Sequence, residues 1–371
     1  LVNRVEMLKA VTFQKDLGSY AAKADRMAAL AAKLSAVLEK SGQKVDGGAV
    51  QQAARLAKTD LSAELVKEFT ELQGIVGGLY AKAQGLPESV ATAIYDQYKP
   101  ESTEDSAPRT LEGAVLSLAD KADSIAGMFA LGLVPSGSKD PFALRRQANG
   151  IVKTIVEHKL PLNLAQIMAD ARNGYKGSEA EKKLTLSGEA YVQAVRGFFR
   201  ERLEFYLRDV LGLAYDVVNA TLAAGADDVV DAVARASAVA KVRPSSDFES
   251  ISVAFKRMKN ILRQAAETNK KVAEPFNPVA LIDDEEKKLA EAVPGVAKKV
   301  KELSASREYE PALHEISRLR PPIDAFFDKV MVMVEDENLR AQRLGLLQTL
   351  VNEFSSIADF SEIVTEKAPR P

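Results

Sequence analysis

Hydrophobic positions repeat with helical spacing along almost the whole chain. One example is a stripe on one side of a helical wheel, formed by Leu144, Ala148, Ile151, Val152 and Ile155. Alanine and leucine are abundant, and no run of alternating β-branched residues is long enough to indicate a strand. The pattern therefore predicts an all-α fold.

Clusters of polar, glycine and proline residues interrupt the helical pattern. The clearest breaks are at Ser41–Gly48, Tyr98–Thr110 and Pro135–Pro141. The stretch from Ala171 to Ser187 is polar and rich in small residues, which is typical of a linker. We therefore predict a first helical domain over residues 1–170, a linker over 171–188 and a second helical domain over 189–371.

The composition is that of a globular protein, with 46% hydrophobic and 27% charged residues among 371. The net charge of −2 means that any RNA-binding surface must be a local patch. The absence of cysteine excludes disulfides, thiol catalysis and cysteine-bound zinc, and fits a reducing compartment such as the cytoplasm.

The chain has no segment that predicts membrane insertion. Its longest uncharged apolar run, Ile125–Pro135, is too short to cross a bilayer, and no signal peptide is evident. Residue 1 is leucine and the sequence begins inside an amphipathic pattern. We interpret the chain as a fragment of a longer polypeptide, with no membrane partner.

The stretch GLVPSGSKDPFALRR, Gly132–Arg146, nearly matches a phosphate-binding loop. In that motif lysine follows the second glycine directly, whereas here Lys139 comes one position late. Asp140 occupies the position that should offer a hydroxyl group to magnesium, and its carboxylate would repel phosphates. A nucleotide loop is therefore disfavoured.

The same stretch is better explained as the start of a helix. Asp140 suits the N-cap position and Pro141 the first helical position. The face opposite the apolar stripe would then carry Arg146, Asn149 and Lys153, with Arg145 at the edge of the stripe. This basic face is either solvated or in contact with a phosphate backbone.

Motifs for enzymatic chemistry are weak. The only histidines are His158 and His314, and the zinc motif H-E-x-x-H fails because Arg318 replaces its second histidine. Asp120 and Asp123 share one helical face, where they are either solvated and paired with lysine or form a carboxylate pair for a metal. No active site is predicted from these residues.

The segment GSKDPFALRR resembles the beta subunit of the bacterial-type glycyl-tRNA synthetase, of which it is a hallmark. Further segments resemble this family in the expected order: VTFQKDLGSYAAKADRM (Val11–Met27), AKTDLSAELVKEFTELQGIVGGLYA (Ala57–Ala81), FKRMKNI (Phe255–Ile261) and DAFFDKVMVMVEDENLRAQRLGLL (Asp324–Leu347). The resemblance spans essentially the whole chain and corresponds to roughly the C-terminal half of that subunit.

The resemblance implies that the first domain is HD-like, a helical fold in which phosphohydrolases hold metal with histidine and aspartate. The corresponding place here reads Lys58-Thr59-Asp60, with no histidine, and Asp120 and Asp123 correspond to the region of the last acid. Carboxylates without imidazole make a poor di-metal cage. We therefore expect a degenerate site at Asp60, Asp120 and Asp123 that holds no metal.

The second domain resembles the all-helical anticodon-binding domain of the DALR type, shared with arginyl-tRNA synthetase. Its closing motif has counterparts at Asp328, Val330, Val332, Leu339, Arg340, Arg343 and Leu344. Arg343 falls on an apolar stripe, and a buried charge must be paired. We predict a structural ion pair between Arg343 and an acid such as Asp328 or Asp336, in preference to an RNA contact.

A basic strip follows the apolar stripe of Ile251, Phe255, Met258 and Leu262. Lys256, Lys259 and Arg263 cluster on another helical face, where they are either solvated or contact phosphates. With the resemblance, the predicted tRNA-binding residues are Lys139, Arg145, Arg146, Lys153, Arg200, Lys256, Arg257, Lys259, Arg263 and Arg340.

The resemblance implies that this chain is the tRNA-binding part of a glycine-tRNA ligase and is not catalytic by itself. Its partners would be glycine tRNA and the alpha subunit, or a fused alpha region. The intact enzyme would use ATP and Mg²⁺ on the alpha subunit, with no cofactor in this fragment. The alternatives are a metal-dependent HD-type phosphohydrolase and a helical scaffold that binds only protein.

Overall fold

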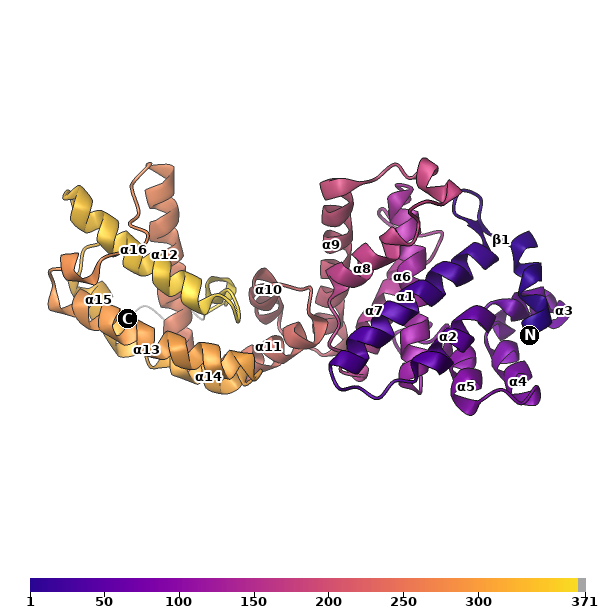
Figure 1. Cartoon of the computed structure of the whole chain (residues 1–371). Helices are drawn as coiled ribbons and strands as arrows, with labels where there is room; N and C mark the ends of the chain where they lie inside the picture. The colour runs from indigo at the N-terminus through magenta and orange to yellow at the C-terminus, as the bar shows by residue number, and fades with distance from the viewer. Residues whose placement is uncertain (366–371) are drawn as a thin grey trace. The chain divides into compact units, whose positions relative to one another are not determined.

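The computed structural model describes residues 1–365 (Figure 1). In this range α-helices predominate, and the only sheet is a two-stranded antiparallel ladder of β1 (Thr12–Gln14) and β2 (Gly18–Ser19). The prediction of a helical fold is confirmed, since strands of three and two residues are too short to produce a readable alternation. Within the same range, no helix is both long and apolar enough to span a membrane.

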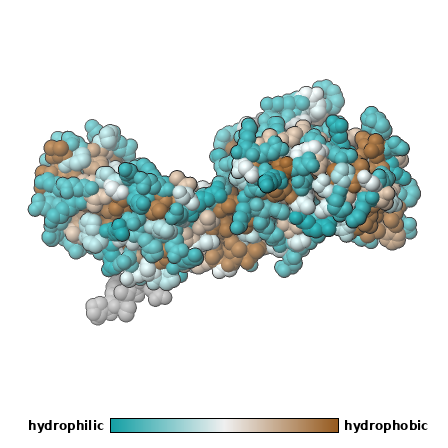
Figure 2. Space-filling model, turned by 60° about the horizontal axis from the view of Figure 1, so that its bottom comes forward, coloured by the Kyte–Doolittle hydropathy of each residue, from teal (hydrophilic) through white to brown (hydrophobic). Residues whose placement is uncertain are grey.

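The chain divides into two compact units. The N-terminal unit comprises Leu1–Tyr206 and Asp227–Val230, and the C-terminal unit comprises Leu207–Ala226 and Asp231–Pro371. In Figure 2, hydrophilic residues cover most of the visible face of each unit, with smaller hydrophobic patches between them. This distribution is that of ordinary water-exposed helical surfaces.

The α-helices of the N-terminal unit are α1 (Tyr20–Lys40), α2 (Gly47–Leu56), α3 (Glu64–Glu68), α4 (Ile75–Ala83), α5 (Glu88–Asp96), α6 (Leu111–Ala130), α7 (Leu144–Glu157), α8 (Leu164–Asn173) and α9 (Gly188–Phe205). Short 3-10 helices lie at η1 (Val2–Arg4), η2 (Glu6–Ala10), η3 (Thr59–Ser62), η4 (Thr70–Leu72) and η5 (Glu179–Lys183).

After a π-helix at Tyr206–Val210 come α10 (Tyr215–Ala223), α11 (Val229–Val242), α12 (Ser246–Glu267), α13 (Asp284–Ala305), α14 (Tyr309–Ser317), α15 (Arg320–Lys329) and α16 (Glu337–Phe354). Two further 3-10 helices are η7 (Pro278–Ala280) and η8 (Phe360–Glu362).

Helix α6 is the centre of the N-terminal unit. Every residue from Gly113 to Ala130 is buried, because α1, α2, α5, α7, α8 and α9 pack around it. Most of its residues are apolar or small on all sides, as in a fully enclosed helix, but Asp120, Lys121 and Asp123 are buried among them. Thr110 caps its start by accepting a hydrogen bond from the Gly113 N–H at 3.1 Å. Gly132, with φ of +78°, ends it, so the first glycine of the apparent phosphate loop is a helix terminator.

The predicted linker at 171–188 is instead part of the N-terminal unit. Tyr175 is fully buried, and its hydroxyl donates to the Asp123 carbonyl at 2.9 Å. Helix α9 also belongs to this unit, since the rings of Phe129 and Phe198 lie 4.9 Å apart. The division between the units therefore falls C-terminal to the predicted linker, near Tyr206, because one buried tyrosine anchors a segment whose composition is otherwise polar.

The C-terminal unit is a helical bundle whose core joins α12, α13, α14, α15, α16 and η8. Phe255 on α12 packs edge-to-face against both Phe354 and Phe360, with centroid distances of 6.5 and 5.1 Å. Ile251 and Met258 are buried on the same side of α12, as the stripe predicts, whereas Leu262 is only partly buried. This core fixes which face of α12 points outward.

Candidate nucleic-acid interface

The outward face of α12 carries the basic strip. Lys256 and Arg263 are both exposed, and Arg263 makes only loose contacts, 3.4 Å to Asn260 Oδ1 and 3.9 Å to Glu267. Ser245 caps the helix by accepting from the Phe248 N–H. These two cations are therefore held on a rigid helix while their head groups remain accessible, which suits phosphate contacts.

The other two cations of α12 already have partners. Lys259 forms an ion pair with Asp359, a residue next to η8. Burial alone would raise the pKa of Asp359, yet hydrogen bonds from Lys259 and Ser361 lower it. The guanidinium group of Arg257 lies 4.2 Å from the ring centroid of Phe327 on α15. Lys259 and Arg257 thus brace α12 against its neighbours as well as facing solvent.

Arg340 does not lie on the surface as predicted. Only 7% of it is exposed, and its guanidinium donates to the carbonyls of Val334 and Glu335 at 2.8 and 3.3 Å. The reason is that Arg340 stands in the first turn of α16 and ties that turn to the loop that precedes it. It is a structural residue and not an open phosphate contact.

Arg343 is buried and paired, but with different acids from those predicted. It donates to Glu286 at 2.6 Å, to Asp283 at 2.5 Å and to the Met331 carbonyl at 2.8 Å. Asp336 serves instead as the N-cap of α16, accepting from the backbone N–H groups of residues 338 and 339. The expectation of an ion pair was right, and the choice of Asp328 or Asp336 was wrong because α13 packs against α16.

In the N-terminal unit, α7 begins at Leu144 and not at Pro141. Asp140 still caps it, since its carboxylate accepts from the N–H groups of Leu144 at 2.8 Å and Arg145 at 2.9 Å. The intervening residues form a turn that ends at Ala143, whose φ is +51°. The Asp140 side chain therefore caps the helix from four residues before its first residue. An N-cap assignment from sequence assumes that the capping residue directly precedes the helix, so it placed the start too early.

Two of the predicted contacts on α7 have open head groups and one does not. Arg146 is exposed and Arg145 is half-buried, and neither guanidinium has an acceptor within the described chain. Lys153 is only 14% exposed, because its ammonium group donates to the Thr103 carbonyl at 2.6 Å. Lys139, in the turn with Ser136, and Arg200, on α9, are exposed. Lys153 is thus a structural residue.

The three acids assigned to a degenerate metal site are all buried, but they do not form a cage. Asp60 Oδ2 accepts from the backbone N–H groups of Gly74 at 2.6 Å and Gly77 at 3.2 Å, so it caps α4. Burial raises the pKa of Asp60, and these hydrogen bonds oppose the rise. Asp120 and Asp123 lie on α6. Within residues 1–365, no cluster of three or more histidines and acids could hold a metal ion.

Cationic side chains occupy the positions around these acids. Lys23 and Lys58 bind Asp120 at 2.9 and 2.6 Å, and the two cations hold the pKa of Asp120 well below its usual range although burial alone would raise it. Arg26 binds Asp123 through two nitrogens, at 2.7 and 3.1 Å. An ammonium or guanidinium group bound to each carboxylate would repel a metal ion, so this donor set does not fit one.

Lys121 completes the group. Its ammonium donates to the carbonyls of Tyr98 at 3.0 Å and Lys99 at 2.8 Å and to Ser117 Oγ at 2.7 Å. Burial lowers the pKa of Lys121 to about 8, even though the Asp120 carboxylate favours its charged form. The lysine-paired alternative for Asp120 and Asp123 is thus confirmed, but the partners are Lys23 and Arg26 on α1 and Lys58 between α2 and η3, and not the neighbouring Lys121.

A readable signal for the missed partners did exist. On α1, Lys23 lies in the same helical stripe as Met27, Leu30 and Leu34, all of which are buried. A lysine in such a stripe must find an acid in the core, which is the reasoning that correctly identified Arg343 as paired. The same test applied to α1 would have predicted an internal ion pair.

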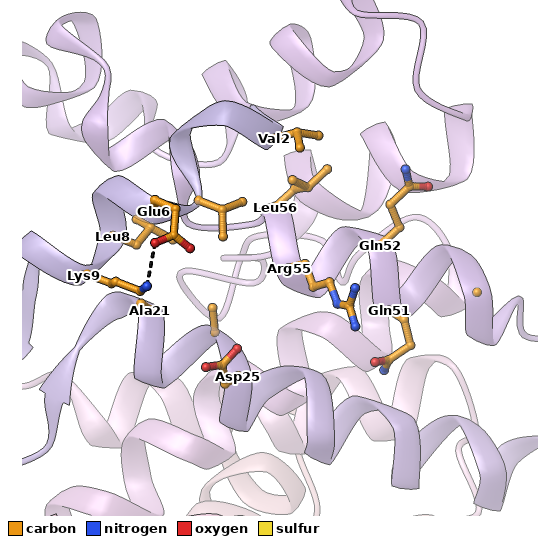
Figure 3. Close-up of a pocket in the computed structure, with 13 residues that line it drawn as sticks. Val2, Glu6, Leu8, Lys9, Ala21, Asp25, Gln51, Gln52, Arg55 and Leu56 are labelled. Atoms are coloured by element: carbon orange, nitrogen blue, oxygen red, sulfur yellow. Dashed lines mark hydrogen bonds and ion pairs between the residues drawn. The ribbon is translucent and has the colours of Figure 1, made fainter. Parts of the chain in front are cut away.

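A further pocket lies elsewhere in the N-terminal unit and has a volume of about 810 Å³ (Figure 3). It is lined by η2, α1 and α2, with Asp25 and Arg55 at its polar side and an ion pair between Glu6 and Lys9 of 2.5 Å. None of the predicted site residues lines it. The predicted residues and this pocket therefore do not coincide.

A family model described as "Glycyl-tRNA synthetase beta subunit" matches residues 1–223. The chain belongs to the glycyl-tRNA synthetase beta-subunit family. A second model, "DALR anticodon binding domain", matches residues 251–360, which run from α12 to η8. The basic strip of this beta-subunit family member thus lies on the first helix of its DALR domain.

Similar proteins agree with this assignment. A protein of Acidobacterium capsulatum named "Glycine--tRNA ligase beta subunit" is 54% identical over 98% of this chain and 51% of its own length. Proteins of the same name from Geobacter metallireducens and Desulforamulus reducens are 41% and 40% identical, over 98% and 99% of this chain. The chain spans about half the length of these relatives.

Proposed function

We propose that this chain binds glycine tRNA and positions it for aminoacylation at an active site on the alpha subunit. The observation that carries the proposal is the exposed pair Lys256 and Arg263 on the first helix of the DALR domain. The name of that domain model supports anticodon binding, and the two side chains supply the phosphate contacts that such binding needs.

The N-terminal unit would contact the acceptor arm or the body of the tRNA. Arg146, Arg145 and Lys139 are the candidates there, since Arg146 and Lys139 are exposed and the Arg145 guanidinium has no acceptor within residues 1–365. Contacts made far from the reacting atoms can still raise the rate, because they orient the 3′ end of the tRNA. In the intact enzyme of the cytoplasm, ATP and Mg²⁺ would act on the alpha subunit.

The rival function is a surviving HD-type phosphohydrolase. The lysine and arginine partners of Asp120 and Asp123 argue against it, because they occupy the oxygens that a metal would need. A third possibility, a scaffold that binds only protein, predicts no affinity for tRNA at modest salt.

The test is a binding titration of the purified chain with glycine tRNA and with the same tRNA carrying a different anticodon. We expect binding that weakens steeply with salt and that is tighter for the cognate anticodon. Equal affinity for the two tRNAs would refute the anticodon assignment. No measurable affinity at 50 mM salt, the lower end of the usual range, would refute the function as a whole.

A further inference from the structure

The lysines described above line a cavity. It has a volume of about 280 Å³, and its walls include Lys23, Lys58, Lys121 and Arg146. We call it the lysine cavity. The lysines come from α1, from the turn between α2 and η3 and from α6, and Arg146 comes from the first turn of α7. A cavity of this size lies at the small end of the range for ligand sites.

The lysine cavity has an excess of positive charge. Four cationic side chains line it against two lining carboxylates, Asp120 and Glu101, while Lys23 is also paired with Asp123 at 3.2 Å. Both oxygens of Asp120 are already bound by Lys23 and Lys58, and Glu101 is exposed. Buried charge without a counter-ion is costly, so an anion entering from solvent would be favoured.

Two of the lining cations keep donor capacity. The only hydrogen-bond acceptor of Lys58 Nζ in the described range is Asp120, and its ammonium otherwise lies 3.9 Å from the centroid of the Tyr98 ring. An ammonium group has three donors, so Lys58 can make further hydrogen bonds. Arg146 has no acceptor in the same range, and its guanidinium can bind an oxyanion with two parallel hydrogen bonds.

The cavity also has aromatic walls, formed by Phe13, Tyr20 and Tyr98. Aromatic rings beside cationic groups suit a base attached to a phosphate. A phosphate monoester carries close to two negative charges at neutral pH, so the cationic lining would attract it.

We propose that the lysine cavity binds the phosphate monoester of a 5′-nucleotide, with Lys58 and Arg146 contacting its oxygens. The nucleotide is either a free mononucleotide or the 5′-terminal residue of an RNA. The cations bind the phosphate without hydrolysing it, because the carboxylates that could hold a metal are bound to lysine and arginine. The site is separate from the basic strip of the DALR domain and does not depend on anticodon binding.

The experiment is isothermal titration of the chain with AMP, inorganic phosphate and adenosine. We expect AMP and phosphate to compete for one site and adenosine to bind far more weakly. Arg146→Ala should weaken AMP binding about tenfold through loss of a charge-assisted contact. The control is Arg55→Ala, which removes an exposed arginine of α2 that does not line the cavity and should leave AMP binding unchanged. Arg146 is exposed, so the variant should fold normally.

A second arm distinguishes the source of the nucleotide. Glycine tRNA with a 5′-phosphate is compared with the same tRNA carrying a 5′-hydroxyl, in the wild-type chain and in Arg146→Ala. A preference for the 5′-phosphate that Arg146→Ala abolishes would support the RNA end as the ligand. Absence of binding by AMP and phosphate together with no 5′-phosphate preference would overturn the proposal, as would binding that Arg146→Ala leaves intact.

Discussion

Arg343 on α16 donates to Glu286 on α13 at 2.6 Å, and both side chains are almost completely buried. Glu286 simultaneously accepts from the backbone N–H groups of Ile282 and Asp283, so one carboxylate caps α13 and binds α16. The exposed face of the DALR-domain helix α12 keeps its position only if the neighbouring helices α13 and α16 stay in place. This buried ion pair joins those two helices.

Glu286→Gln should destabilise the C-terminal unit by about 3 kcal/mol, because it removes the fully buried carboxylate that binds Arg343 and leaves only Asp283, which is half-buried. The measurement is urea unfolding followed by circular dichroism. Glu302→Gln, on the same helix, breaks an exposed pair with Lys299 at 3.8 Å and should cost less than about 1 kcal/mol. An equal loss of unfolding free energy in the two variants would show that the buried pair stabilises the unit no more than the exposed one.

The same pair predicts an acid dependence of stability. Burial alone would raise the pKa of Glu286, but its hydrogen bonds from Arg343 and the backbone lower it below the usual 4.5. A carboxyl group whose pKa is lower in the folded state stabilises above its unfolded pKa, and that stability is lost as pH falls through the folded value. The difference in unfolding free energy between wild type and Glu286→Gln should thus be full at pH 7 and shrink below about pH 4. A difference independent of pH would contradict the assignment.

The basic strip should set the salt dependence of tRNA binding. If Lys256 and Arg263 each contact one phosphate, Lys256→Ala with Arg263→Ala should reduce the slope of log affinity against log salt by about 1.5. The control is Lys288→Ala with Lys298→Ala, two exposed lysines of α13 that remove the same charge. If both double variants change the slope equally, binding depends on overall charge and not on the α12 face.

Metal-dependent hydrolysis should be absent. With Mn²⁺ or Mg²⁺ present, the chain should release no phosphate from nucleotides, since cationic side chains bind the oxygens of Asp120 and Asp123. A colorimetric phosphate assay is sufficient. Metal-dependent release that disappears in Asp60→Asn would instead establish the phosphohydrolase.

Gly127 on α6 should be intolerant of a side chain. A Cβ atom there would lie 2.3 Å from the Tyr175 hydroxyl oxygen, so Gly127→Ala should cost about 1–3 kcal/mol by overpacking. Gly197→Ala on α9 meets no atom within 4 Å and should be neutral or stabilising by up to about 1 kcal/mol, because alanine favours helix. Thermal unfolding compares the two. A neutral Gly127→Ala would show that Tyr175 can move away at little cost.

The local part of this protein could be predicted from its sequence. Helical periodicity gave the fold class and the buried sides of α7 and α12, because each is a relation between residues three or four positions apart. The sequence also indicated that Arg343 must be paired, because an arginine on a buried leucine stripe needs a charge partner.

Tertiary packing decided everything that joins distant segments. Arg343 pairs with Asp283 and Glu286 because α13 lies against α16. Lys23 and Lys58 pair with Asp120 because α1 and α2 pack around α6. The polar segment around Tyr175 belongs to the N-terminal unit because the Tyr175 hydroxyl donates to the Asp123 carbonyl on α6. A periodic pattern specifies which side of a helix is buried, but it contains no information on which other helix covers that side. The pairing of buried charges depends on which helix that is.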